Sequence, residues 1–121
     1  MVPYLQSALR IAAALLFFTH GTQKLFAYPG GTRVALVSMF GVAGVLETAG
    51  GALLLVGAFT RPVAFVAAGE MAYAYFTAHL RRGTWPILNG GELAVLYCFV
   101  WLFFSAAGAG PISIDALRGR R

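Results

Sequence analysis

Four apolar segments, each close to the length that crosses a lipid bilayer, occupy most of this 121-residue sequence. They cover residues 4–27, 41–59, 62–80 and 90–107. A helix needs about 20 residues to cross the hydrocarbon core, and in lipid its backbone polar groups must be paired within the segment. None of the four alternates apolar and polar residues as a barrel strand does. We therefore expect four transmembrane α-helices.

Links rich in glycine, proline and arginine separate the segments: the first begins with residues 28–31, and the others contain residues 60–62 and 81–86. Short links make neighbouring helices antiparallel. The sequence thus predicts an all-α fold, a polytopic membrane protein in which one domain, residues 1–121, forms an antiparallel four-transmembrane-helix bundle. A tail begins at Gly108, where the helix should break. We expect Ser113, Asp115 and the arginines of this tail to face water.

The composition agrees with a membrane location. Sixty per cent of the residues are hydrophobic, 11% are charged and the mean hydropathy is +0.77, whereas a soluble domain carries about 25% charged residues. The net charge is +5, and the basic residues stand mostly at segment ends. That placement suits anionic lipid headgroups, so the expected partner is the bilayer and no nucleic acid.

The orientation depends on how arginine and lysine divide between the two faces. With four spans, both termini lie on the same side as Arg61. The basic residues of that side are Arg10, Arg61, Arg118, Arg120 and Arg121, and those of the other side are Lys24, Arg33, Arg81 and Arg82. Because positive charge favours the cytoplasmic side, we expect a multi-pass protein with both termini in the cytoplasm.

Seven ionisable residues lie within or at the ends of the apolar segments. A charge in lipid costs at least about 2.5–3.5 kcal/mol, so such side chains turn inward and find partners. They are Arg10, His20, Lys24, Glu47, Glu70, His79 and Glu92.

Their depth in the membrane separates these residues into two groups. One group lies toward the end where the first link begins, and together with a tyrosine it forms the candidate ligand pocket. Its members are His20, Lys24, Glu47, Glu92 and Tyr97. The second group is Arg10 with Glu70, nearer the other end.

Two interpretations of the first group stay open. In one, Lys24 pairs with Glu47 or Glu92 as a structural ion pair that fixes helix register; in the other, the same groups bind a ligand or move protons. Gly44 and Gly51 share a helical face with Glu47, and such small residues let another helix approach closely. His79 and Trp85 are expected to be interfacial anchors, with His79 on the side opposite Glu70.

Several kinds of site are not expected. The two histidines and three membrane glutamates lack close ligand spacing on one helix, so we assign no metal. The one cysteine, Cys98, lies in an apolar segment and cannot form an internal disulfide or a dithiol pair. We assign no catalytic residue, and whether the chain is an enzyme stays open.

An ordered set of short motifs runs along the chain. Arg10 is followed by His20-Gly21 and Lys24-Leu25, and later motifs span residues 47–51, 53–57, 60–61, 89–92, 108–110 and 113–115. This ordered set resembles the DoxX family of small four-span bacterial membrane proteins. The resemblance covers nearly the whole chain. It implies the bacterial cytoplasmic (inner) membrane and, through relatives in thiosulfate:quinone oxidation and in oxidative and thiol stress, a redox setting.

The function expected from the residues and the resemblance is a membrane subunit of an oxidoreductase-related system. Such a subunit would bind a quinone, or a similar lipid-soluble ligand, in the polar pocket and would dock with oxidoreductase partner proteins. The alternative is a non-catalytic scaffold or assembly factor in which the charges only hold the helices together. A small transporter is a third hypothesis, and it would need a homodimer because four spans are few.

Overall fold

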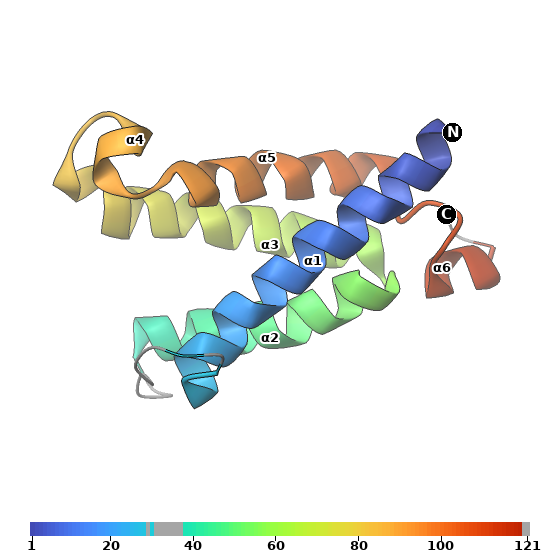
Figure 1. Cartoon of the computed structure of the whole chain (residues 1–121), viewed down its shortest axis with the longest axis horizontal. Coiled ribbons are helices and arrows are strands. Elements are labelled where there is room, and N and C mark those ends of the chain that lie inside the picture. Colours follow the sequence, from blue (N-terminus) through green and yellow to red (C-terminus); the bar gives the residue numbers. More distant parts are fainter. Residues whose placement is uncertain (29, 31–37, 120–121) are drawn as a thin grey trace.

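The computed structural model describes residues 1–28, 30 and 38–119, and for residues 39 and 40 it describes the backbone alone. The predicted basic residues Arg33, Arg120 and Arg121 lie outside these ranges. All regular structure in the described part is helical, which confirms the all-α prediction (Figure 1). The elements are α1 (Val2–Phe26), α2 (Met39–Val56), α3 (Thr60–Ala74), η1 (Tyr75–His79), η2 (Leu80–Arg82), α4 (Pro86–Asn89), α5 (Glu92–Ala107) and α6 (Ile114–Leu117).

The long helices form two closely packed pairs. Helix α1 packs along α2, and α3 packs along α5, while α2 also contacts α3. Figure 1 shows α1 crossing obliquely over the other helices, with the N-terminus and α6 at the same end of the molecule. The C-terminal tail at this end lies against the link between α2 and α3, where the N–H of Asp115 donates to the carbonyl of Gly57.

Glycine residues allow α1 and α2 to approach closely. A Cβ added at Gly51 would lie 2.8 Å from Phe18 Cα, and one added at Gly44 would lie 3.0 Å from Lys24 Cβ. On the facing helix, a Cβ at Gly21 would collide with the backbone of Thr48. The predicted contact face of Gly44 and Gly51 is thus confirmed, and Gly21 is its counterpart on α1.

Aromatic side chains fill the centre of the bundle. Phe17 of α1 makes edge-to-face contacts with Tyr97 and Trp101 of α5, at centroid distances of 5.4 and 5.5 Å. Trp101 also packs against Phe104, and both are fully buried. These residues recur every three or four positions along α5, so one face of this helix is a core face.

The C-terminal tail returns to the bundle, and the prediction that Asp115 faces water is wrong. Asp115 is 5% exposed. Its carboxylate accepts hydrogen bonds from the backbone N–H groups of Phe59 and Thr60, both at 2.9 Å, at the start of α3. No side chain of its own sequence caps that helix, so Asp115 supplies the missing acceptor from 55 residues away.

One helix of the described part, α1, is both long and apolar enough to cross a bilayer. Two more apolar helical stretches, Gly41–Val56 and Glu92–Ala107, are shorter than that length. Many large apolar side chains nevertheless face outward from all the long helices, among them Leu9, Leu16, Val45, Leu53, Phe65, Val66, Leu96, Phe99 and Phe103. An apolar exterior of this extent is typical of a surface that meets lipid or another protein.

Candidate functional site

A cavity of about 590 Å³ opens among the four long helices, near the end of α1 that carries His20 and Lys24. Most of its wall is apolar, from side chains such as Phe17, Leu46 and Met71. Each long helix also adds polar groups to the lining. These are His20 and Lys24 from α1, Glu47 from α2, Glu70 from α3 and Tyr97 from α5. The size and lining are typical of a pocket for a small, largely apolar ligand.

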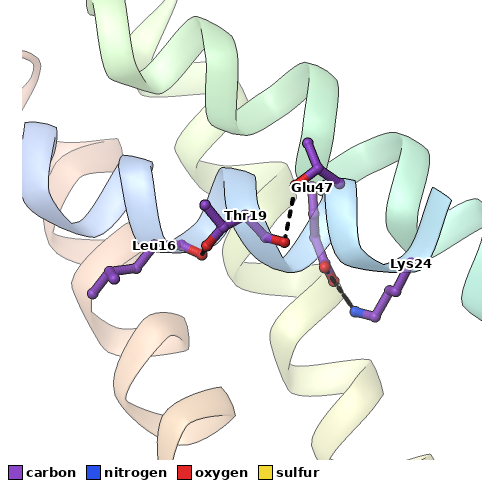
Figure 2. A network of polar contacts seen from close by, with 5 residues as sticks. Leu16, Thr19, Lys24 and Glu47 are labelled. Atoms are coloured by element: carbon purple, nitrogen blue, oxygen red, sulfur yellow. Dashed lines mark hydrogen bonds and ion pairs between the residues drawn. The ribbon is translucent and has the colours of Figure 1, made fainter. Parts of the chain in front are cut away.

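Lys24 and Glu47 form an ion pair across the α1–α2 contact. Lys24 Nζ lies 2.7 Å from Glu47 Oε1 and 2.8 Å from Oε2, so both carboxylate oxygens accept from one ammonium group (Figure 2). The Glu47 side chain is 1% exposed, whereas that of Lys24 is 27% exposed. Of the two partners that the sequence allowed for Lys24, the structure therefore selects Glu47. In the same view Thr19 donates to the carbonyl of Leu16, at 2.8 Å.

Glu70 lies beside this ion pair. It lines the same cavity as Lys24 and Glu47, and its Oε1 is enclosed without a donor from the described part of the chain. The cavity wall therefore carries the carboxyl groups of both Glu47 and Glu70. Glu70 belongs with the candidate pocket, although the sequence placed it in the second group.

Tyr97 brings a hydroxyl group to the cavity. Its side chain is 5% exposed, and no described residue gives its hydroxyl a hydrogen-bond partner. The ring packs edge-on against His20, with centroids 6.0 Å apart, and against Phe17. A buried polar group without a partner costs free energy, so this hydroxyl is available to a bound molecule.

Glu92 is the member of the predicted pocket that the structure places elsewhere. It is the first residue of α5, it is exposed, and it lines a separate hollow with Pro86 and Phe99. An acidic residue in the first turn interacts favourably with the helix dipole. The position of Glu92 is thus explained by helix initiation, and the other four predicted residues share the cavity.

The sequence suggested that Arg10 reaches Glu70, but the structure places the Arg10 side chain elsewhere. It is 1% exposed, and its guanidinium donates to the carbonyls of Leu54 at 2.9 Å and Ile112 at 2.7 Å, and also to that of Ala109. The carbonyls at the end of α2 carry the negative end of that helix dipole. Arg10 therefore joins α1, the end of α2 and the C-terminal tail.

His79, which was not assigned to the pocket, lines the cavity, and Asn89 holds the turn beside it. Asn89 is 1% exposed. Its amide donates to the hydroxyl of Tyr75 at 3.1 Å and to the carbonyl of Gly83 at 2.9 Å, and its Oδ1 accepts from Gly91 N at 2.9 Å. His79 lines the cavity and lies 3.3 Å from the carbonyl of Asn89. The Asn-Gly-Gly sequence before α5 was the feature of the sequence that could have pointed to this turn.

The π-helical turn η1 explains why His79 was placed on the wrong side. A regular α-helix would put His79 opposite Glu70, nine positions earlier in the chain. A π turn contains more residues per turn and changes the helical phase of the residues within and beyond it. The chain from Tyr75 to His79 adopts this turn, which brings His79 round to the cavity. Within the described residues, no three His, Cys, Asp or Glu side chains gather closely enough to hold a metal ion.

The fold and the cavity define a small helical protein with an apolar exterior, an internal ion pair and a mostly apolar ligand-sized pocket. A family model described as DoxX matches residues 5–80. A protein of Haemophilus influenzae, named as uncharacterized, is 45% identical over 120 residues, which cover 93% of this chain and 90% of that protein. The chain belongs to the DoxX family, a family of membrane-associated proteins, as the resemblance predicted. No solved structure gives a significant match.

Proposed function

We propose that the chain crosses the bacterial inner membrane four times, through α1, α2, the helix that begins at α3, and α5. The outward apolar side chains on these helices support this topology, and so do the inward positions of Arg10 and Glu47. Helix α5, with 16 residues, spans about 24 Å, and a bilayer accommodates a short span by thinning. Both termini then lie at the face that carries Arg61, which we place in the cytoplasm.

Within this topology, the cavity binds a quinone or a similar lipid-soluble ring compound. The observation that carries this proposal is the Tyr97 hydroxyl, buried and without a described partner in the wall of a mostly apolar cavity of about 590 Å³. A quinone needs an apolar slot for its ring and a few polar groups at its two oxygens. Tyr97, His20 and Lys24 come from helices that the fold brings together at this one place.

The protein acts as a membrane subunit of an oxidoreductase-related system rather than as a complete redox enzyme. One cysteine is fewer than the four that hold a typical iron–sulfur cluster. Electrons for a bound quinone would therefore come from a partner protein that carries the redox centre. The role of this chain is to bind and orient the ligand inside the membrane.

A direct titration tests ligand binding. The purified protein in lipid nanodiscs is titrated with a short-chain quinone, and binding is followed by quenching of tryptophan fluorescence, since Trp101 contacts Tyr97. We expect saturable binding, weakened about tenfold by Tyr97→Phe if one hydrogen bond worth about 1.4 kcal/mol is lost. A wild-type protein that shows no saturable binding would refute the proposal.

A scaffold or assembly factor is the second candidate, and the Lys24–Glu47 pair is the observation in its favour. A bidentate pair between two helices also serves to fix their register. The double substitution Lys24→Met with Glu47→Gln removes the charges in a balanced way. A well-folded double variant that keeps its activity in cells favours the scaffold, whereas loss of quinone binding and of activity favours the ligand site.

A further inference from the structure

The cavity reaches the surface of the bundle on the side of α2 and α3. Phe17 and Tyr97, which line its inner part, are buried, whereas Val42 and Leu46 of α2 and Tyr73 of α3 line the same cavity and are exposed. A side chain that lines a cavity and also faces outward belongs to the rim of an opening. Since the three exposed side chains come from α2 and α3, the opening lies between these two helices.

The packing of the helices explains why the bundle is open at this place. Figure 1 shows α2 and α3 moving apart from the short link that joins them. At its far end, α2 packs on α1, where a Cβ at Gly44 would lie 3.0 Å from Lys24 Cβ. The chain beyond α3 packs on the start of α5 instead, where a Cβ at Gly91 would lie 2.6 Å from Tyr75 Cε1. Because α2 and α3 turn to different partners, the cavity opens between them.

In the proposed topology this opening faces the hydrocarbon of the bilayer. At a rise of about 1.5 Å per residue, Tyr73 lies about 20 Å along α3 from its first residue, Thr60. Leu46 lies about 10 Å along α2 from its first residue, Met39. The two helices run in opposite directions, so both positions fall at a similar depth, inside a hydrocarbon core about 30 Å thick.

The chemistry of the cavity changes from its interior to this opening. Two polar atoms without a described partner, the Tyr97 hydroxyl and Glu70 Oε1, belong to the wall of the cavity. The opening is bordered instead by the hydrocarbon side chains of Val42 and Leu46 and by the ring of Tyr73. A molecule matches this order when its polar head points inward and its apolar tail points outward. Such a tail has no need to leave the lipid, because acyl chains are as apolar as the side chains that it would meet inside.

We propose that the ligand is an amphiphile with a long apolar tail, that it enters the cavity sideways from the bilayer between α2 and α3, and that its tail stays in the opening lined by Val42, Leu46 and Tyr73. This inference rests on the proposed function, because it concerns the same cavity and names the class of the ligand and its route. The alternative route is from water, through the polar end of the cavity, which His79 and Arg82 line.

The first test narrows the opening. Leu46→Trp adds a bulky ring at the rim, at an exposed position where most substitutions are well tolerated. With a tritiated long-tailed quinone in nanodiscs, followed by scintillation proximity, we expect association with this variant to be about tenfold slower than with wild type. Val45→Trp, at the neighbouring exposed position of α2 outside the cavity lining, is the matched control and should associate as wild type does.

The second test uses wild-type protein, so it does not depend on how a variant folds. A long-tailed quinone that carries a diazirine on the part of its tail next to the ring is bound in nanodiscs and photolysed. We expect adducts on Val42, Leu46 or Tyr73 that excess unmodified long-tailed quinone suppresses.

Two results would overturn the inference and leave the proposed function standing. One is association with a well-folded Leu46→Trp variant at the wild-type rate. The other is adducts that the competitor suppresses but that lie only on His79 or Arg82, at the polar end. If the wild type binds no quinone and the competitor suppresses no adduct, the proposed function itself fails.

Discussion

Asp115 and Arg10 show how single charged residues fasten the C-terminal tail to the helices. Asp115 caps α3 through two backbone N–H groups and donates its own N–H to the carbonyl of Gly57. Arg10 bonds carbonyls at the end of α2 and in the tail. Gly57 lies between them with φ 71°, and a side chain there would meet Arg10 and Ser113. The polar residues at this end thus satisfy backbone groups, whereas those at the other end line the cavity.

Removing the Asp115 carboxylate should destabilise the fold and leave the cavity at the other end of the bundle unchanged. Asp115→Ala leaves two N–H groups at the start of α3 without acceptors, which we expect to lower the free energy of unfolding by about 1–2 kcal/mol. Denaturation in detergent measures the loss. Asp115→Asn retains one acceptor oxygen and should lose less. Equal stability of Asp115→Ala and wild type would contradict the capping role.

The same residue predicts a pH dependence. Burial alone would raise the pKa of the Asp115 carboxyl, but the N–H groups of Thr60 and Phe59 and the charge of Arg118 together hold its pKa below the ordinary value of 3.8. A pKa that is lower in the folded state means a contribution to stability that is complete above the unfolded pKa. The contribution is lost as the pH falls through the folded pKa. Wild type should therefore lose more stability than Asp115→Asn on acidification below about pH 5, and parallel melting curves would contradict this.

At the scale of elements, the close contact of α1 and α2 positions the Lys24–Glu47 pair. Gly51→Ala adds a Cβ that would lie 2.8 Å from the backbone of Phe18, so the helices must separate. We expect a loss of about 1–3 kcal/mol and weaker ligand binding. Gly69→Ala in α3, where nothing lies within 4 Å of the added Cβ, is the matched control.

The control should be neutral or slightly stabilising, because alanine favours helix over glycine. Thermal unfolding and quinone titration of both variants measure the two effects. If Gly51→Ala and Gly69→Ala behave alike, the close contact does not matter to the site.

The helical elements and much of the site were predictable from the sequence, for physical reasons. Long apolar segments between glycine and proline links predict helices, and charged residues within those segments must turn inward. On these grounds the sequence placed His20, Lys24, Glu47 and Tyr97 in one group, and all four line one cavity. His79 was not placed there, because the π turn at Tyr75–His79 depends on packing, which sequence spacing does not show. Glu70 was grouped with Arg10, which bonds backbone carbonyls of Leu54 and Ile112 instead. Glu92 lies outside this cavity because it sits at the start of α5, where an acidic side chain needs no partner inside the bundle.

At the scale of the whole molecule, the proposed topology puts the tail and the α3–α4 link on opposite faces of the membrane. In a Cys98→Ser background, Leu117→Cys and Thr84→Cys each introduce one exposed thiol. A membrane-impermeant maleimide should label Thr84→Cys in intact spheroplasts and Leu117→Cys only after permeabilisation. Labelling of both variants from the same side would contradict a single crossing through α5 and the path of the chain in Figure 1.

The measurement that tests the ligand site most directly is photolabelling with an azido-quinone in nanodiscs, followed by mass spectrometry of the peptides. We expect adducts on cavity residues such as Phe17, Met71 and Tyr97, and we expect excess unmodified quinone to suppress them. Adducts confined to outward-facing side chains such as Phe99 and Phe103, unchanged by the competitor, would show that the compound only dissolves in the surrounding lipid and would contradict the proposed site.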